Sequence, residues 1–224
     1  MKVAVLLHGK FANFKSDFKS LLRAIGPKHE VDVFYAKNKG EGVDITEYLR
    51  FVNPVAYVHE EAEWDHDFEN YPKHSTSTYK NTACMYKTRL RLWETFEKEK
   101  TKNYDLCISS RADIHFESDL NLTYFLENKN KLFIPFAESH GGYNDHVAVG
   151  SYKNMKVYLT LYNQIKKLLE GGTLFHPETL LLHHLHYAKT PVERFGLCWS
   201  LARPSAEGFT YFVEGRPIDP SLKH

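Results

Sequence analysis

Apolar residues along this chain form short continuous runs that alternate with stretches at helical spacing. The run 3–7 is continuous, which is typical of a strand buried on both faces, and apolar residues recur at helical spacing over 13–25. The alternation continues with a strand at 31–35, a short helix at 45–52 and a strand at 55–58. This pattern predicts βαβ units. We therefore expect an α/β fold with a Rossmann-like, mostly parallel sheet flanked by helices.

The longest predicted helix begins at a cap formed by Ser77 or Thr78 and ends at about Lys100. Its apolar residues recur at steps of three and four, so one face should pack on the core. Its basic residues are expected mostly on the solvated face, with room for one to point into a site: Lys80, Lys87, Arg89 and Arg91.

The second half of the chain predicts further elements. These are a helix at 120–126 capped by Asp119, strands at 131–136 and 146–149, a helix from Ser151 to Leu169, a helix starting at Pro177, and one possible strand at 195–201. We expect one domain over 1–224, with a loosely structured tail from about 190 that wraps the body.

The stretch 104–117, YDLCISSRADIHFE, begins as an apolar strand and ends in polar residues. Ligands of α/β proteins bind at the carboxyl ends of parallel strands. If the segment stays extended, Arg111, Asp113 and His115 share one face. A cation, a carboxylate and an imidazole together suit an anionic ligand with a bridging divalent metal. The alternative is a strand end closed by an Arg111–Asp113 ion pair.

Composition narrows the function classes. The 29 basic and 28 acidic residues give a formal net charge of +1, without the basic excess typical of nucleic-acid-binding proteins. The 3 cysteines lie far apart in apolar surroundings, which favours reduced thiols and a cytoplasmic location. No apolar run reaches the roughly 18 residues of a membrane span, and the first residues predict a strand and not a signal peptide. Neither a P-loop nor a dinucleotide-binding glycine motif occurs.

Five short motifs occur in an order that is similar to one enzyme family. They are VAVLLHGKFANF, VDVFYAKN, YDLCISSRADIHF, GGYNDHVAVGSYKNMKVY and HPETLLLHHL. Together they resemble small GT-A-type nucleotide-sugar glycosyltransferases, especially the compact kinds of large DNA viruses and of bacterial surface-polysaccharide gene sets. The resemblance rests on these motifs and not on continuous identity. It implies a GT-A-like fold and transfer of a sugar from a nucleotide sugar, expected to be a UDP-sugar, to a glycan or other hydroxyl acceptor.

The resemblance also implies roles on the donor side. The D-x-D metal motif of the family matches Asp113-Ile114-His115, in which imidazole replaces the second carboxylate, so Asp113 and His115 would bind Mn²⁺ or Mg²⁺. Arg111 and Lys87 would face the donor diphosphate. The loop after the first strand would hold the nucleobase and ribose through Leu7, His8, Gly9 and Lys10.

On the acceptor side, the G-G-x-N-D segment would contact sugar hydroxyls through Asn144 and Asp145, and the H-P-E segment would place Glu178 near the anomeric carbon. Asp145 and Glu178 are thus the candidates for the base that takes the acceptor proton. Each also has a structural alternative. Asp145 suits a turn, and Glu178 suits the first turn of a helix, where its charge complements the helix dipole.

Two other functions stay open. The missing second aspartate favours a catalytically silent nucleotide- or glycan-binding module, which would release no UDP from any nucleotide sugar. A sugar nucleotidyltransferase would be expected to carry a glycine-rich loop with arginine or lysine after the first strand. Here that loop offers only Gly9 and Lys10.

Overall fold

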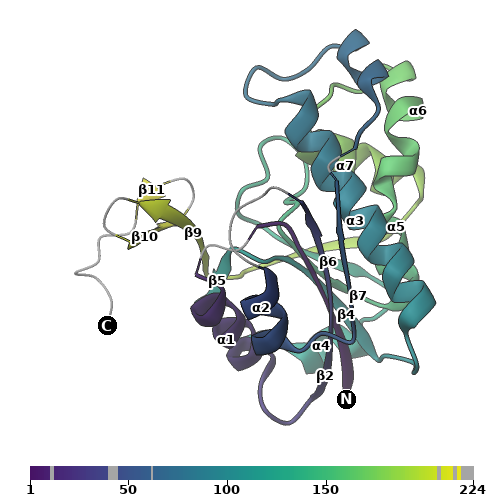
Figure 1. The fold of residues 1–224 in the computed structure, drawn as a ribbon. Coiled ribbons are helices and arrows are strands. Elements are labelled where there is room, and N and C mark those ends of the chain that lie inside the picture. The colour runs from purple at the N-terminus through teal and green to yellow at the C-terminus, as the bar shows by residue number, and fades with distance from the viewer. Residues whose placement is uncertain (11–12, 40–44, 62, 206–207, 214–215, 218–224) are drawn as a thin grey trace.

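A computed structural model of the chain describes residues 1–10, 13–39, 45–61, 63–205, 208–213 and 216–217. The described residues form a seven-stranded sheet in the order β3-β2-β1-β4-β7-β6-β8 (Figure 1). Only β7 runs antiparallel to its neighbours, β4 and β6. The mostly parallel α/β architecture predicted from the sequence is therefore confirmed. The strands are β1 (Lys2–His8), β2 (Glu30–Asn38), β3 (Ala56–Glu60), β4 (Leu106–Arg111), β6 (Leu132–Pro135), β7 (Val147–Gly150) and β8 (Val192–Phe195).

Helices cover both faces of this sheet. Residues of α1, α2 and α4 join one buried cluster, and residues of α3, α5, α6 and α7 join the other. Figure 1 shows α1 and α2 on the opposite side of the sheet from α3 and α5. The helices are α1 (Phe14–Ile25), α2 (Ile45–Val52), α3 (Tyr79–Glu99), α4 (Leu122–Glu127), α5 (Tyr152–Leu159), α6 (Ile165–Glu170) and α7 (Pro177–Tyr187), with short 3₁₀ helices η1 (His66–Asn70) and η2 (Leu161–Gln164).

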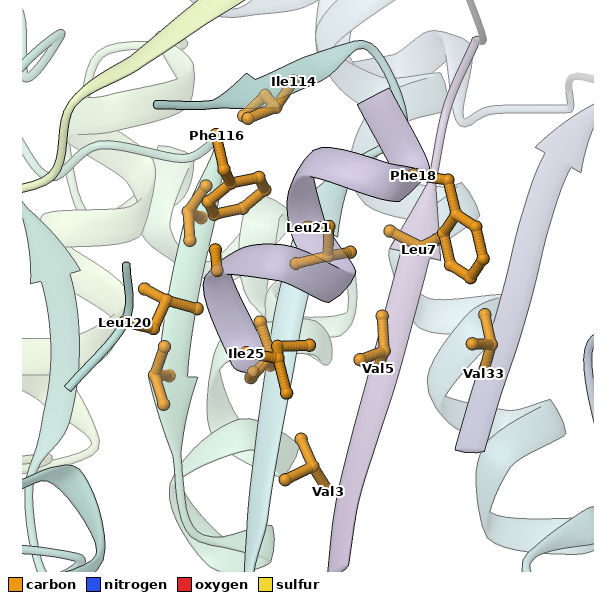
Figure 2. Close-up of a cluster of buried hydrophobic side chains, with 14 of the residues drawn as sticks. Val3, Val5, Leu7, Phe18, Leu21, Ile25, Val33, Ile114, Phe116 and Leu120 are labelled. Atoms are coloured by element: carbon orange, nitrogen blue, oxygen red, sulfur yellow. The ribbon is translucent and has the colours of Figure 1, made fainter. Parts of the chain in front are cut away.

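Strand β1 is apolar from Val3 to Leu7 because both of its faces are buried. Successive side chains of a strand point to opposite faces. Val3, Val5 and Leu7 therefore pack toward α1 (Figure 2), while Ala4 and Leu6 join the cluster under α3. All five are at most 3% exposed. Burying a valine or leucine side chain contributes about 1.5–3 kcal/mol, so this strand anchors both layers.

Of the helix caps predicted at Ser77 or Thr78, at Asp119 and at Ser151, the first and the last are confirmed and the one at Asp119 is wrong. The Thr78 hydroxyl caps α3 by accepting from the Asn81 amide, and Ser151 caps α5. Helix α4 begins later than expected, because Asn121 and not Asp119 caps it, accepting from the Tyr124 amide at 3.1 Å.

The single helix predicted from Ser151 to Leu169 is also wrong. It breaks at Thr160, whose hydroxyl donates to the Lys156 carbonyl at 2.8 Å, and the chain continues through η2 into α6. The Thr160 amide donates to the same carbonyl at 3.1 Å, and a hydroxyl that shares this acceptor weakens and often bends a helix.

The end of the chain differs most from the prediction. The strand expected at 195–201 is two strands, since β8 ends at Phe195 and β9 (Trp199–Ser205) begins after a break. Strand β9 pairs with β5 (Ile114–Phe116) and β10 (Gly208–Val213), and β11 (Arg216–Pro217) completes a small second sheet. The described part of the predicted tail is thus largely strand. No local pattern predicts this, because the partner strand β5 lies about eighty residues earlier in the chain.

A tight turn ends the central strand. β4 stops at Arg111, and β5 starts at Ile114 after a turn at Ala112 and Asp113. The Arg111 amide donates to the His146 carbonyl at 3.0 Å, and the Ala112 amide donates to the His8 carbonyl at 2.9 Å. The expectation that 111, 113 and 115 share one face of an extended segment is therefore wrong.

Candidate functional site

A cleft of about 370 Å³ opens at the carboxyl ends of β1 and β4. These strands pair in parallel, with His8 opposite Arg111, so the residues that follow both strands meet at one edge of the sheet. One side of α3 forms the facing wall. The lining residues are His8, Gly9, Lys10, Asn38, Lys80, Asn81, Cys84, Met85, Thr88, Arg111 and Asp113. Three basic side chains against one carboxylate give the cleft a chemistry suited to phosphate.

Arg111 and Asp113 form a two-pronged ion pair at the cleft wall. Arg111 Nε donates to Asp113 Oδ1 at 2.9 Å, and Nη2 donates to Oδ2 at 2.7 Å. Burial opposes the charge of Arg111, but the neighbouring Asp113 carboxylate raises the pKa of Arg111 above its ordinary value. The Arg111 side chain is still 23% exposed. The ion-pair alternative is thus part of the geometry, and the same guanidinium also faces the cleft as a permanent cation.

His115 lies elsewhere. Its Nδ1 is 3.4 Å from Asp17 Oδ1 and 3.4 Å from the Ser16 hydroxyl, both on α1. Because the chain turns at 112–113, the His115 side chain contacts α1, whereas Arg111 lines the cleft. Sequence reasoning missed this turn because neither glycine nor proline marks it, and an aspartate such as Asp113 suits both a turn and a binding site.

The predicted metal pair does not fit one shared ion in this conformation. Both carboxylate oxygens of Asp113 already accept from Arg111, and the His115 imidazole contacts α1. Within the part of the chain that the structure describes, no group of three or more His, Cys, Asp or Glu side chains is placed to hold a metal. We therefore derive no chemical step through an ion, and the Asp113–His115 pair stays a prediction.

The residues expected to hold the nucleotide differ in their orientation. Leu7 points into the core between sheet and α1 (Figure 2), so its side chain does not line the cleft. Gly9 has φ +90°, a left-handed conformation that favours glycine, and no atom lies within 4 Å of where a Cβ would be. Lys10 lines the cleft with Gly9.

His8 lines the cleft, and its side chain is buried. Burial, followed by the charges of Arg89 and Arg111, lowers the pKa of His8 well below its ordinary value. Its Nε2 is buried and has no hydrogen-bond partner among the described residues. Buried polar atoms are normally paired, so an unpaired nitrogen at a cleft wall indicates a place for a polar ligand atom.

Lys87 does not reach this cleft. Its Nζ lies 4.8 Å from the centre of the Tyr162 ring, and the residue lines a separate pocket with Glu60 and Glu63. Lys80 lies two helical turns earlier, about 10 Å along α3, and lines the cleft instead. The sequence predicts both lysines on α3. Which of them lines the cleft depends on where α3 begins relative to the ends of β1 and β4, and the structure shows that it is Lys80.

Asn144 and Asp145 serve the turn before β7. The Asn144 amide donates to the Ala137 carbonyl at 2.7 Å, and its oxygen accepts from the His146 amide at 2.8 Å. Asn144 is fully buried, so its side chain is engaged in holding the loop. The turn alternative therefore accounts for Asn144 without a sugar.

Asp145 is the counter-ion of a buried arginine. Its Oδ2 lies 3.6 Å from Arg89 Nη2, and Arg89 is fully buried. Burial opposes the charge of Asp145, but His146, Arg89 and Arg111 together hold the pKa of Asp145 below its ordinary value. The expectation that Arg89 lies on the solvated face is wrong. It follows Tyr86 by three residues, within the buried stripe of α3, which is the signal that could have revealed it.

Glu178 lies in a second cavity of about 430 Å³ that adjoins the first, since Asn81 lines both. Burial and the nearby charge of Asp145 raise the pKa of Glu178 to about 7. Its Oε2 lies 3.2 Å from His176 Nε2. A carboxyl group with this pKa changes protonation near neutral pH, as a general base or acid requires. Of the two predicted carboxylates, Glu178 thus has the environment of a reactive group and Asp145 that of a structural one.

Comparison with known proteins supports the fold. No family model matches the sequence, and no curated protein matches it. Among solved structures, the chain is similar to mouse xyloside xylosyltransferase 1 in its apo form, with a TM-score of 0.52 and 10% identity over 87% of this chain and 85% of that chain. It also matches a protein assigned as a nucleotide-diphospho-sugar transferase from Desulfovibrio desulfuricans, with a TM-score of 0.48 and 10% identity over 87% of this chain and 79% of that chain.

At this identity the likeness to the xylosyltransferase shows the fold and nothing further. Within the described residues, no helix has both the length and the apolar composition needed to cross a membrane. The GT-A-like α/β fold that the five sequence motifs predict is confirmed.

Proposed function

We propose that this protein transfers a sugar from a nucleotide-diphospho-sugar, with UDP as the expected nucleotide, to a hydroxyl group of a glycan or other acceptor. One observation carries the proposal. A basic cleft at the strand ends adjoins a cavity that contains a buried carboxylate, and the two share Asn81. Glycosyl transfer needs these two chemistries side by side, one for the departing diphosphate and one for the incoming hydroxyl.

The basic cleft suits the donor. Negative charge develops on the nucleoside diphosphate as it leaves, and fixed cations stabilise that charge. Asp113 takes the Nε–Nη2 edge of Arg111, so the Nη1 side of the planar guanidinium is the part that meets phosphate oxygens, and Lys80 adds a point charge from the facing helix. The unpaired Nε2 of His8 and the open backbone at Gly9 supply polar contacts for the rest of the nucleotide.

The adjoining cavity suits the acceptor. The reacting sugar carbon passes through an oxocarbenium-like state, and the attacking hydroxyl gives up its proton as the bond forms. Glu178 in its ionised form accepts that proton, and its pKa of about 7 makes the ionised form available at neutral pH. His176 Nε2 lies 3.2 Å from Glu178 Oε2, beside the carboxylate.

A catalytically silent nucleotide-binding module is the second candidate. The observation in its favour is that Arg111 occupies both oxygens of Asp113, the carboxylate that would otherwise bind a metal. Both candidates bind the nucleotide in the same cleft. They differ in turnover, because only the enzyme releases UDP from a UDP-sugar.

Calorimetric titration with UDP and a panel of nucleotide sugars tests the donor cleft, and UDP release tests turnover. Arg111→Lys keeps the charge but loses the fork, so it should lower turnover at least tenfold, equivalent to about 1.4 kcal/mol of barrier. Arg91→Lys is the matched control, because Arg91 pairs with Glu60 outside the cleft. Nucleotide binding without release of UDP from any sugar would favour the silent module. Equal behaviour of the two variants would remove Arg111 from the site.

A further inference from the structure

We infer that the cavity beside Glu178 is an acceptor subsite for a neutral, hydroxyl-bearing sugar. The inference rests on the proposed glycosyl transfer and specifies which class of acceptor it uses. The cavity, at about 430 Å³, lies within the roughly 300–1,000 Å³ common for small-molecule sites. Its lining brings together two helix starts, those of α3 and α7, and the loop between β6 and β7 that carries His140.

The lining is polar but carries no strong cation. Hydroxyl and amide groups of Thr76, Ser77 and Asn81 face the cavity together with imidazoles, and neither lysine nor arginine occurs among its described lining residues. The donor cleft has three such cations. Phosphate recognition favours arginine and lysine, whereas sugar hydroxyls both donate and accept hydrogen bonds. We therefore assign the anionic substrate to the basic cleft and a neutral substrate to the cavity beside Glu178.

Two neighbouring imidazole rings line the cavity. The rings of His74 and His176 have centroids 4.7 Å apart and are tilted by 47°. Each is held by a hydroxyl, since His74 Nδ1 lies 2.7 Å from Thr76 Oγ1 and His176 Nδ1 lies 3.0 Å from Thr179 Oγ1. Flat rings fixed in this way can pack against the apolar face of a pyranose, while hydroxyls at the ring edge meet the polar lining.

One oxygen of the Glu178 carboxylate can accept a hydrogen bond from a ligand. Glu178 Oε2 is buried and has no hydrogen-bond partner among the described residues, although His176 Nε2 is near. Only 9% of the Glu178 side chain is exposed. A buried carboxylate oxygen that accepts no hydrogen bond is unfavourable unless a ligand donates one to it. A sugar hydroxyl supplies the missing donor without adding charge, which an anionic acceptor would do.

The backbone around the cavity is held in place at several points. The Tyr86 hydroxyl donates to the Pro177 carbonyl at 2.7 Å, and the Tyr143 amide donates to the Glu178 carbonyl at 3.1 Å, so the first turn of α7 is fixed from both sides. The loop that carries His140 adopts positive φ at two non-glycine residues, Glu138 and His140. Such strain persists where surrounding contacts impose it, and it concentrates at binding and catalytic sites.

Release of nucleoside diphosphate from a UDP-sugar, with methyl glycosides of neutral hexoses and pentoses as acceptor probes, tests the subsite. Hexose 6-phosphates serve as the anionic comparison, and release without a probe reports donor hydrolysis. Thr76→Trp adds bulk at an exposed residue that lines the cavity. Ser75→Trp adds the same bulk at the exposed neighbour that does not line it.

We expect neutral glycosides to accelerate release above hydrolysis. Thr76→Trp should lower kcat/KM for the glycoside at least tenfold while hydrolysis persists, and Ser75→Trp should match the wild type. Acceleration by sugar phosphates alone, or an unchanged kcat/KM in Thr76→Trp, would overturn the subsite and leave the proposed transfer standing. Absence of any release from every nucleotide sugar by the wild type would overturn both.

Discussion

Gly142 is the residue whose substitution tests most sharply how Glu178 is positioned. A Cβ added at Gly142 would lie 2.1 Å from the Glu178 carbonyl oxygen and 2.7 Å from the Thr179 amide nitrogen. Real Cβ atoms essentially never approach closer than 3.0 Å, so Gly142→Ala must open this contact by about 0.9 Å. Because the neighbour is backbone of α7 and not a flexible side chain, the first turn carrying Glu178 has to move.

The expected effect follows from that displacement. A shift of about 1 Å in a reacting group can lower the rate about 100-fold, which corresponds to about 2.7 kcal/mol of barrier. Overpacking should also lower the free energy of unfolding by about 1–3 kcal/mol. The assay is steady-state sugar transfer, together with UDP affinity by calorimetry and a thermal melt. Transfer should fall while UDP affinity stays near that of the wild type, because the donor cleft is untouched.

Two other glycines supply matched controls. Gly196→Ala places a methyl group in open space at an exposed position, so transfer and stability should not change. Gly141→Ala meets no atom within 4 Å but imposes φ +81° on alanine, which isolates backbone strain from the clash. If Gly142→Ala kept full transfer while its melting temperature fell, the position of Glu178 would not matter to the reaction and the assignment would be refuted.

Four further predictions follow from the contacts. Lys80→Ala should weaken UDP binding, whereas Lys87→Ala, two turns farther along α3, should not; calorimetry that ranks them the other way would restore Lys87 to the site. Asp145→Asn leaves the buried guanidinium of α3 without its counter-ion, so urea unfolding at pH 7 should show a loss of about 3–5 kcal/mol; an unchanged midpoint would contradict a structural role. Because the pKa of Glu178 is raised to about 7, the transfer rate should rise with pH through that value, and the folded protein should hold an extra proton between the ordinary carboxyl pKa and about 7. Stability therefore falls as pH rises through that window, so Glu178→Gln should melt higher than the wild type at pH 8 while losing transfer; a lower melting temperature with transfer intact would exclude the role. His115→Ala should leave the response of transfer to EDTA unchanged, since the imidazole contacts α1; loss of a metal-dependent rate in this variant would establish His115 as a ligand.

Much of the fold was predictable because its signals are local. The apolar run of β1, the helical spacing of α1 and the cap at Thr78 each depend on neighbouring residues, and the structure confirms them. The same holds for the meeting of Gly9 and Arg111, since adjacent parallel strands bring their carboxyl ends together. The small second sheet was not predictable, because β9 finds its partner β5 through the fold and not through its own pattern.

The candidate site was predictable only in part, for similar reasons. A period of two correctly assigns faces within a strand, but the turn after Arg111 ends the strand and sends His115 toward α1. Residue type alone could not separate Asp145, which neutralises a buried arginine, from Glu178, which lacks such a partner. The difference arises because α3 places Arg89 beside Asp145, and this contact depends on how the helix packs on the sheet.

We propose that one cavity binds a nucleotide sugar and that the adjoining cavity binds the acceptor whose hydroxyl attacks it. Mass-spectrometric detection of sugar transfer tests this most directly, with the wild type, Arg111→Lys and Glu178→Gln incubated with UDP-sugars and a panel of neutral glycosides. We expect a glycosylated product with the wild type, at least tenfold less with Arg111→Lys, and none with Glu178→Gln although that variant still binds UDP. Full product formation by both variants, or no product and no UDP release from any donor by the wild type, would contradict it.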